Sequence, residues 1–166
     1  MKYKWIDYTV DYAPIIESWI DSDARKYTGC DDGWDNYFEY WKNFSGTKIG
    51  ENFWAKVIFN GNTPFAVMAI SLQDGTGAVC EYIIDPLKRG KGYGSSALIE
   101  LMTFGTKIIG HEILFAEAVI FPSNIPSQKV FEKAGYVFDH ADPDGDVWYY
   151  KYQKAMRCFF DCDCTD

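Results

Sequence analysis

The stretch that decides the fold runs from Glu81 to Glu100 and reads EYIIDPLKRGKGYGSSALIE. Its apolar beginning ends at Asp85-Pro86 and is typical of a strand, whereas the residues after Gly94 have the apolar spacing of a helix. The loop between them, Arg89 to Gly94, contains three glycines and two cations. Glycine allows backbone N–H groups to converge on a ligand, and the following helix adds the positive end of its dipole. The stretch therefore predicts a cradle for an anion such as a pyrophosphate.

The spacing of the glycines separates the known kinds of phosphate loop. A P-loop requires Gly-Lys followed by Ser or Thr, which the sequence lacks. A dinucleotide fingerprint counted from Gly90 would place its third glycine at Ser95. The pattern that fits is Arg-x-x-Gly-x-Gly, on Arg89, Gly92 and Gly94. A merely flexible glycine loop is the alternative, and the flanking strand and helix weigh against it.

The rest of the chain predicts an alternation of short strands and helices. Strands are expected at 3–10, 53–59, 65–72, up to Asp85, 112–120, 136–140 and 147–156, and helices from Pro14, at 34–44, from Gly94 to Gly110 and at 126–134. Asn60-Gly61 is a strong signal for a tight turn between two antiparallel strands. Three antiparallel strands before the cradle exclude a Rossmann order, and the strand–helix–strand unit after them predicts two parallel neighbours.

Composition limits the class of protein. The chain has 166 residues, 48% of them apolar, which predicts one domain over 1–156 followed by a tail at 157–166. The net charge of −8 argues against nucleic acid as a partner and favours a cationic substrate. We expect no membrane span and a cytoplasmic protein, because no long apolar run occurs. Cys162 and Cys164 in the tail are expected to be free thiols rather than metal ligands.

A second motif follows the cradle, at Asn124-Ile-Pro-Ser127 and Phe131-Glu-Lys-Ala-Gly135-Tyr136. Together with Arg89-x-x-Gly-x-Gly, it resembles the paired motifs of the GNAT superfamily of N-acetyltransferases. The resemblance covers residues 53–156 and extends only weakly into the first fifty. It implies an α+β fold with a mixed, mostly antiparallel sheet of about seven strands, in which two parallel strands splay apart between flanking helices.

The resemblance also implies acetyl-CoA as the cofactor, with its pantetheine arm between the splayed strands, and no metal. The residues that would contact it are Tyr82, Ile83, Ile84, Arg89, Gly90, Lys91, Gly92, Tyr93, Gly94, Ser95, Asn124, Ser127 and Phe131. The diphosphate would be held by backbone N–H groups of residues 90–95, with Arg89 and Lys91 nearby. Asn124 is also suited to cap the helix that follows it.

The reaction that the resemblance implies is direct attack of an amine on the thioester. It passes through an oxyanion, which would be met by a backbone N–H near Ile84, and it needs a base and a proton donor for the thiolate. The usual tyrosine of the family is replaced here by Phe131, so Tyr82, Ser127 and Tyr136 are the candidate donors. Two strand carboxylates are candidates for the base, Glu117 and, less favoured by its position on the strand, Glu81.

The acceptor is expected to be an amine on a small molecule or peptide, drawn by acidic residues of the N-terminal part. These are Asp21, Asp31, Asp32, Asp35 and Glu39. Because Phe131 removes the usual donor, a non-catalytic acyl-CoA sensor is the main alternative, and a nucleotide-binding regulatory domain is a weaker one. Phe159-Phe160 in the tail is consistent with a homodimer.

Overall fold

The computed structural model describes residues 1–27, 53–73 and 77–154. The strands are β1 Lys4–Asp7, β2 Phe53–Asn60, β3 Thr63–Gln73, β4 Gly77–Ile84, β5 Phe115–Ile120, β6 Val137–Ala141 and β7 Trp148–Gln153. The α-helices are α1 Ala13–Ser18, α2 Ser22–Tyr27, α4 Tyr93–Ile109 and α5 Ile125–Lys133, and short 3-10 turns occupy Val10–Tyr12 and Pro86–Lys88. No helix in these ranges is long and apolar enough to cross a membrane.

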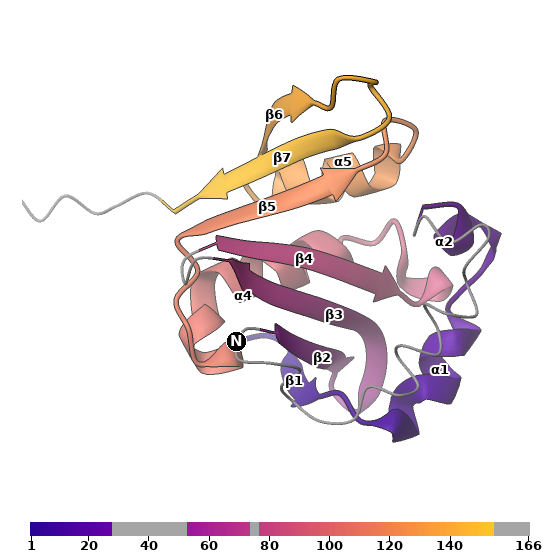
Figure 1. Ribbon diagram of the computed structural model, residues 1–166. Helices are drawn as coiled ribbons and strands as arrows, with labels where there is room; N and C mark the ends of the chain where they lie inside the picture. The colour runs from indigo at the N-terminus through magenta and orange to yellow at the C-terminus, as the bar shows by residue number, and fades with distance from the viewer. Residues whose placement is uncertain (28–52, 74–76, 155–166) are drawn as a thin grey trace, which may run out of the picture.

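The strands form one sheet in the order β1-β2-β3-β4-β5-β7-β6. All neighbours are antiparallel except β4 and β5, which are parallel and connected through α4. The mixed, mostly antiparallel sheet and the parallel pair predicted from the sequence are therefore confirmed. Figure 1 shows α4 and α5 on one side of this sheet and α1 on the other.

The two parallel strands are paired over a short distance only. Their register joins Gly77 to Phe115, Ala78 to Ala116 and Val79 to Glu117, and no pair follows. β4 continues for five residues beyond Val79 and β5 for three beyond Glu117. The strands thus diverge toward their carboxyl ends (Figure 1), as the expected splay requires.

Each face of the sheet has its own apolar core. The face of α4 and α5 packs side chains such as Leu98, Leu101 and Phe131 against Ile84 and the alanines of β5. The opposite face packs Ile16 and Trp19 of the α1 region against Val57, Val67 and Ile83. Alternation along β4 therefore places Tyr82 and Ile84 on the α4 side and Ile83 on the α1 side, as the sequence parity predicted.

Several element boundaries differ from those predicted. The first strand ends at Asp7 rather than at residue 10, because Val10–Tyr12 form a 3-10 turn. The last strand ends at Gln153 rather than at residue 156. The helix α2 was missed, because its sequence SDARKY has no apolar stripe and no buried residue. The predicted helix at 34–44 and the tail at 157–166 lie outside the described residues.

Gly105 sets the approach between α4 and the segment that leads to β5. A Cβ at this position would lie 2.8 Å from the carbonyl oxygen of His111 and 3.1 Å from Cγ1 of Ile113. Alanine in a helix is favoured over glycine by about 1 kcal/mol, but overpacking costs about 1–3 kcal/mol. We therefore expect Gly105→Ala to lower the free energy of unfolding by about 1 kcal/mol in urea titrations. Thr106→Ala, on the exposed side of the same turn, should be neutral or stabilising, and a stabilised Gly105→Ala would contradict this packing.

Candidate active site

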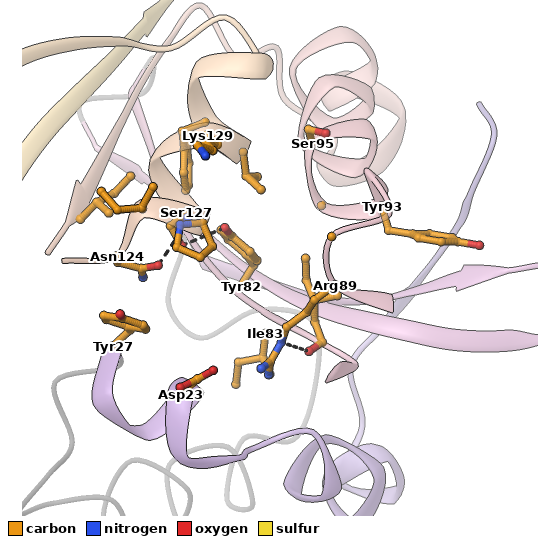
Figure 2. A pocket seen from close by; sticks show the side chains of 18 of the residues that line it. Asp23, Tyr27, Tyr82, Ile83, Arg89, Tyr93, Ser95, Asn124, Ser127 and Lys129 are labelled. Carbon is orange, nitrogen blue, oxygen red and sulfur yellow. Dashed lines mark hydrogen bonds between the residues drawn. The ribbon is translucent and has the colours of Figure 1, made fainter. Parts of the chain in front are cut away.

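One cavity of about 810 Å³ opens where β4 and β5 diverge. Its wall is formed by α2, the carboxyl ends of β4 and β5, the glycine loop and α5. Figure 2 shows Tyr82 and Ser127 in the middle of this cavity, with Asp23 and Tyr27 of α2 on one side and the start of α4 on the other. The volume is in the range of small-molecule and cofactor sites.

The glycine loop has the backbone conformation that an anion cradle needs. Gly90 and Gly92 have φ of 71° and 79°, in the left-handed region that favours glycine, and Gly92 is the N-cap of the 17-residue helix α4. Gly94 packs closely on β4, since a Cβ there would lie 2.6 Å from Cδ1 of Ile84 and that side chain would have to shift. The loop therefore presents its backbone and the start of α4 to the cavity without side chains in the way.

Two side chains of the glycine loop, those of Lys91 and Tyr93, point away from the cradle. Lys91 is exposed, donates to the carbonyl of Leu87 at 2.9 Å and lies outside the cavity wall. The ring of Tyr93 points away from the cavity in Figure 2 and packs on Phe65 at 5.0 Å between centroids. Of these two predicted contacts, Lys91 therefore lies outside the cavity wall, whereas Tyr93 lines the cavity with its ring turned toward Phe65.

Three lysines that were not among the predicted cofactor contacts line the cavity, although one of them, Lys133, belongs to the second motif. Lys88 lies in the turn before the loop, and Lys129 and Lys133 lie four residues apart on α5. Residues four apart share one face of a helix. The spacing of Lys129 and Lys133 therefore predicts that both face the cavity, but only after α5 is known to flank the cradle. Together with the cradle, these cations make the α4–α5 side of the cavity suitable for a polyanion, and coenzyme A fits the residues present.

Arg89 lines the cavity, but its guanidinium faces the N-terminal helices. Its Nη1 lies 2.6 Å from Oδ2 of Asp21, and Nη2 donates to the carbonyl of Trp19 at 3.0 Å. Its Nε donates to the carbonyl of Ile84 at 3.2 Å. Burial alone would raise the pKa of Asp21, but hydrogen bonds from the N–H of Ala24 and from Arg89 lower it overall.

Tyr82 and Ser127 form a hydroxyl pair in the cavity. Tyr82 Oη and Ser127 Oγ are 3.1 Å apart, and either can be the donor. Phe131 is buried beside them, with its ring 5.6 Å from that of Tyr82. The third candidate, Tyr136, instead donates to Sδ of Met102 at 3.5 Å and lies outside the cavity wall. The structure thus brings two of the three candidate donors together.

Asn124 fixes the position of Ser127. Its Oδ1 accepts the backbone N–H of Ser127 at 3.2 Å and caps α5, as the sequence predicted (Figure 2). Because the same residue also lines the cavity, capping and contact with a ligand are compatible. The cap, Ser127 and Tyr82 form one chain of hydrogen bonds from α5 to β4.

Of the predicted carboxylates of the base and of the acceptor site, several lie outside the described residues. Glu117 alternates with the buried Ala116 and Ala118, so it lies on the α1 side of β5, opposite Lys151 of β7 and outside the cavity wall. Glu81 lies in β4, but its side chain is outside the part that the structure describes. Asp31, Asp32, Asp35 and Glu39 are also outside the described residues. Asp23, which was not among the predicted acceptor residues, lines the cavity.

The ionisation of Tyr82 gives a test of its burial. Burial raises the pKa of Tyr82 to about 12, against the smaller opposing effects of Ser127 and Arg89. An unfolded tyrosine loses its proton near pH 10, so this residue makes the free energy of unfolding fall as the pH rises from about 10 to about 12. We expect Tyr82→Phe to make that decline less steep in denaturant titrations. Some decline should remain, because burial also raises the pKa of Tyr8 and of Tyr150. If the free energy of unfolding falls equally with pH in the parent and in Tyr82→Phe, the Tyr82 hydroxyl is exposed to water.

Comparisons with known proteins agree with this geometry. The family model described as "Acetyltransferase (GNAT) domain" matches residues 6–137. Among curated proteins, no sequence matches significantly. The fold is similar to that of aminoglycoside N(6')acetyltransferase from Legionella pneumophila, with 14% identity, a TM-score of 0.73 and 92% of each chain covered.

Two further solved structures share the fold. The aminoglycoside acetyltransferase AAC(6')-Ib in complex with coenzyme A is 15% identical, with a TM-score of 0.70 over 92% of this chain and 95% of that one. N-acetyltransferase PseH from Campylobacter jejuni is 12% identical, with a TM-score of 0.66 over 93% of this chain and 100% of that one. At these identities, the likeness shows the fold alone.

Proposed function

Since the chain belongs to the GNAT acetyltransferase family, whose cofactor is acetyl-CoA, we propose that it transfers the acetyl group to a primary amine by direct attack in a ternary complex. In this reaction the amine nitrogen forms a bond to the carbonyl carbon, the C–S bond breaks, and the products are an amide and the coenzyme thiol. No covalent enzyme intermediate is needed in such a direct attack.

The observation that carries the proposal is the continuity of the cavity. It runs from the glycine cradle, past Tyr82 and Ser127 at the divergence of β4 and β5, to Asp23 and Tyr27 on α2. A ligand held by its diphosphate at the cradle can therefore extend its arm between the strands toward α2. The hydroxyl pair then lies where the arm would end, and α2 lies where an acceptor would enter (Figure 2).

Acetyl-CoA supplies an acyl group already activated as a thioester, so the chain has to bind, orient and move protons. Backbone N–H groups at residues 90–95 hold the diphosphate, helped by Lys88 and Lys129. Tyr82, oriented by Ser127, donates a hydrogen bond to the departing sulfur. With a pKa of about 12 it keeps its proton across the neutral range. A thiol with a pKa near 8.5 needs stabilisation more than complete proton transfer.

Glu117 is the proposed base. It shares the α1-side face of β5 with Val119, two residues further along, and Val119 lines the cavity. Because Glu117 itself lies outside the cavity wall, it would accept the proton of an ammonium that enters from α2 through water. Glu81 on β4 is the second candidate.

The proposed acceptor is a cationic amine. The net charge of the chain is −8, and the described cavity wall contributes a carboxylate, Asp23 of α2, which lies away from Lys129 of α5 (Figure 2). Solved structures of similar fold contain the aminoglycoside acetyltransferase AAC(6')-Ib in complex with ribostamycin or with kanamycin. We propose the same broad class, amines of small molecules or peptides, for this chain.

The test is an acetylation screen with purified full-length protein. Acetyl-CoA is incubated with kanamycin, ribostamycin, spermidine, and peptides with a free N-terminus or lysine, and thiol release and product mass are measured. Thiol release with a mass increase of one acetyl group supports the proposal. Tight binding of acetyl-CoA without release in any mixture would instead establish the sensor, which Phe131 in the family's usual tyrosine position favours. Thermal stabilisation by ATP but not by coenzyme A would overturn both.

A further inference from the structure

Arg89 occupies the first position of the phosphate-loop motif, yet its guanidinium hydrogen-bonds to the end of β4 and to the segment before α2. The guanidinium binds the carboxylate of Asp21 and the carbonyl of Trp19, and Nε binds the carbonyl of Ile84. It thereby joins the end of β4 to the connection between α1 and α2. The side chain is about one third exposed, so it is neither buried in the core nor loose on the surface.

Asp21 transmits this contact to α2. Its Oδ2 faces Arg89, while Oδ1 accepts the N–H of Ala24 at 2.9 Å, and its carbonyl accepts the N–H of Arg25 at 3.0 Å. One carboxylate therefore both caps the helix and binds the arginine. A six-residue helix is marginal by itself, so its position depends on such tertiary contacts.

The other end of α2 is tied to the opposite side of the divergence. Tyr27 Oη donates to the carbonyl of Ser123 at 3.0 Å, in the loop that follows β5. Arg89 follows β4 and Ser123 follows β5, so α2 is attached across the open ends of both splayed strands. Between its two attachments α2 contributes Asp23, Ala24 and Tyr27 to the cavity wall (Figure 2).

We propose that Arg89 is a positioning residue for the acceptor side of the cavity and does not bind the diphosphate. Through Asp21 it places α2, and thereby the carboxylate of Asp23, opposite the hydroxyl pair. The diphosphate is left to the backbone of the cradle and to the lysines. This assignment rests on the proposed function and deepens it, because it names a determinant of acceptor recognition within a loop otherwise devoted to the coenzyme.

The test compares Arg89→Gln with Lys91→Gln, which removes the same charge from the same loop. Calorimetry measures the affinity for coenzyme A, and hydrogen exchange measures the protection of amides 21–27. For Arg89→Gln we expect affinity within about threefold of the parent, together with about tenfold faster exchange in α2. Lys91→Gln should change neither exchange in α2 nor affinity by more than about threefold. A tenfold loss of coenzyme affinity with unchanged exchange in α2 would make Arg89 a phosphate ligand and overturn the proposal.

Two further variants test the same contact in case Arg89→Gln does not fold. Asp21→Asn keeps a capping oxygen but removes the charge that Arg89 binds, and Arg89→Lys keeps a charge without the three-way geometry. We expect Asp21→Asn to accelerate exchange like Arg89→Gln, the double variant to be no worse than either single one, and Arg89→Lys to restore part of the protection. Additive effects in the double variant would contradict a shared role.

Kinetics separates positioning from a general structural loss. With the amine of the screen that turns over fastest, Arg89→Gln should raise KM for the amine about tenfold and change kcat by less than threefold. Equal changes in kcat and in KM for acetyl-CoA would count against the assignment. If the parent protein transfers no acetyl group, the proposed function fails, but exchange and coenzyme affinity still decide whether Arg89 serves α2 or the diphosphate.

Discussion

Gly92→Val should weaken coenzyme A binding about 100-fold. The left-handed conformation costs an L residue about 1–2 kcal/mol, and relief of that strain rotates the N–H groups that would face the diphosphate, each worth about 1.5–3 kcal/mol to a charged partner. The expected effect is measured by calorimetry with coenzyme A and with its diphosphate-containing fragment 3'-phospho-ADP, which should lose affinity in parallel.

Gly110→Val is the matched control, because Gly110 ends the same helix. The two glycines have φ of 79° and 80°, and neither would place a Cβ within 4 Å of another group. Both variants should lose similar free energy of unfolding, but only Gly92→Val should lose affinity. Equal affinity in the two variants would show that the cradle does not bind the coenzyme.

Tyr82→Phe should lower kcat about 100-fold while the affinity for coenzyme A changes less than threefold. The hydroxyl is proposed to interact with the sulfur only as the bond to carbon breaks, and removing one positioned hydrogen-bond donor to developing charge costs roughly 10²–10³ in kcat. Ser127→Ala, which removes the group that orients the hydroxyl, should lower kcat about tenfold. Single-turnover measurements with a saturating amine isolate this step from product release.

Tyr136→Phe is the control for loss of a tyrosine hydroxyl. Tyr136 packs edge-on against Phe131 at 4.9 Å between centroids, but its hydroxyl is bonded to Met102 rather than to the cavity. We expect kcat close to that of the parent. A kcat for Tyr82→Phe that equals the parent's would mean that the thiolate leaves without a side-chain donor, which the replacement by Phe131 also allows.

The parts of the fold that local sequence controls were predicted. The Asn60-Gly61 turn, the apolar stripe from Leu98 to Ile109 and the glycines of the cradle act within a few residues, and the structure has a hairpin, a helix and a left-handed loop at these places. The family resemblance added the mixed, mostly antiparallel sheet of about seven strands and the splay of its two parallel strands. The helix α2 was missed because its stability comes from Asp21 and from contacts with distant segments rather than from an apolar face.

Side-chain roles in the site were harder to predict for the same reason. Arg89 and Asp21 are 68 residues apart and Tyr82 and Ser127 are 45 apart, so no local pattern indicates either pair. The motif identified Arg89 as part of the loop, but the direction of its guanidinium depends on the N-terminal helices. The lysines of α5 became candidates only when the structure placed that helix beside the cradle.

The short ladder between β4 and β5 creates a free edge inside the sheet. Beyond Val79 and Glu117, no strand of the described residues pairs with the main-chain groups that face the gap, so an amide-containing arm in the gap can serve as a surrogate strand. Ligand binding would then join β1–β4 to β5–β7 mechanically as well as fill a pocket. The coenzyme would then be a structural part of the sheet, and its release would leave the facing edges of β4 and β5 unpaired again.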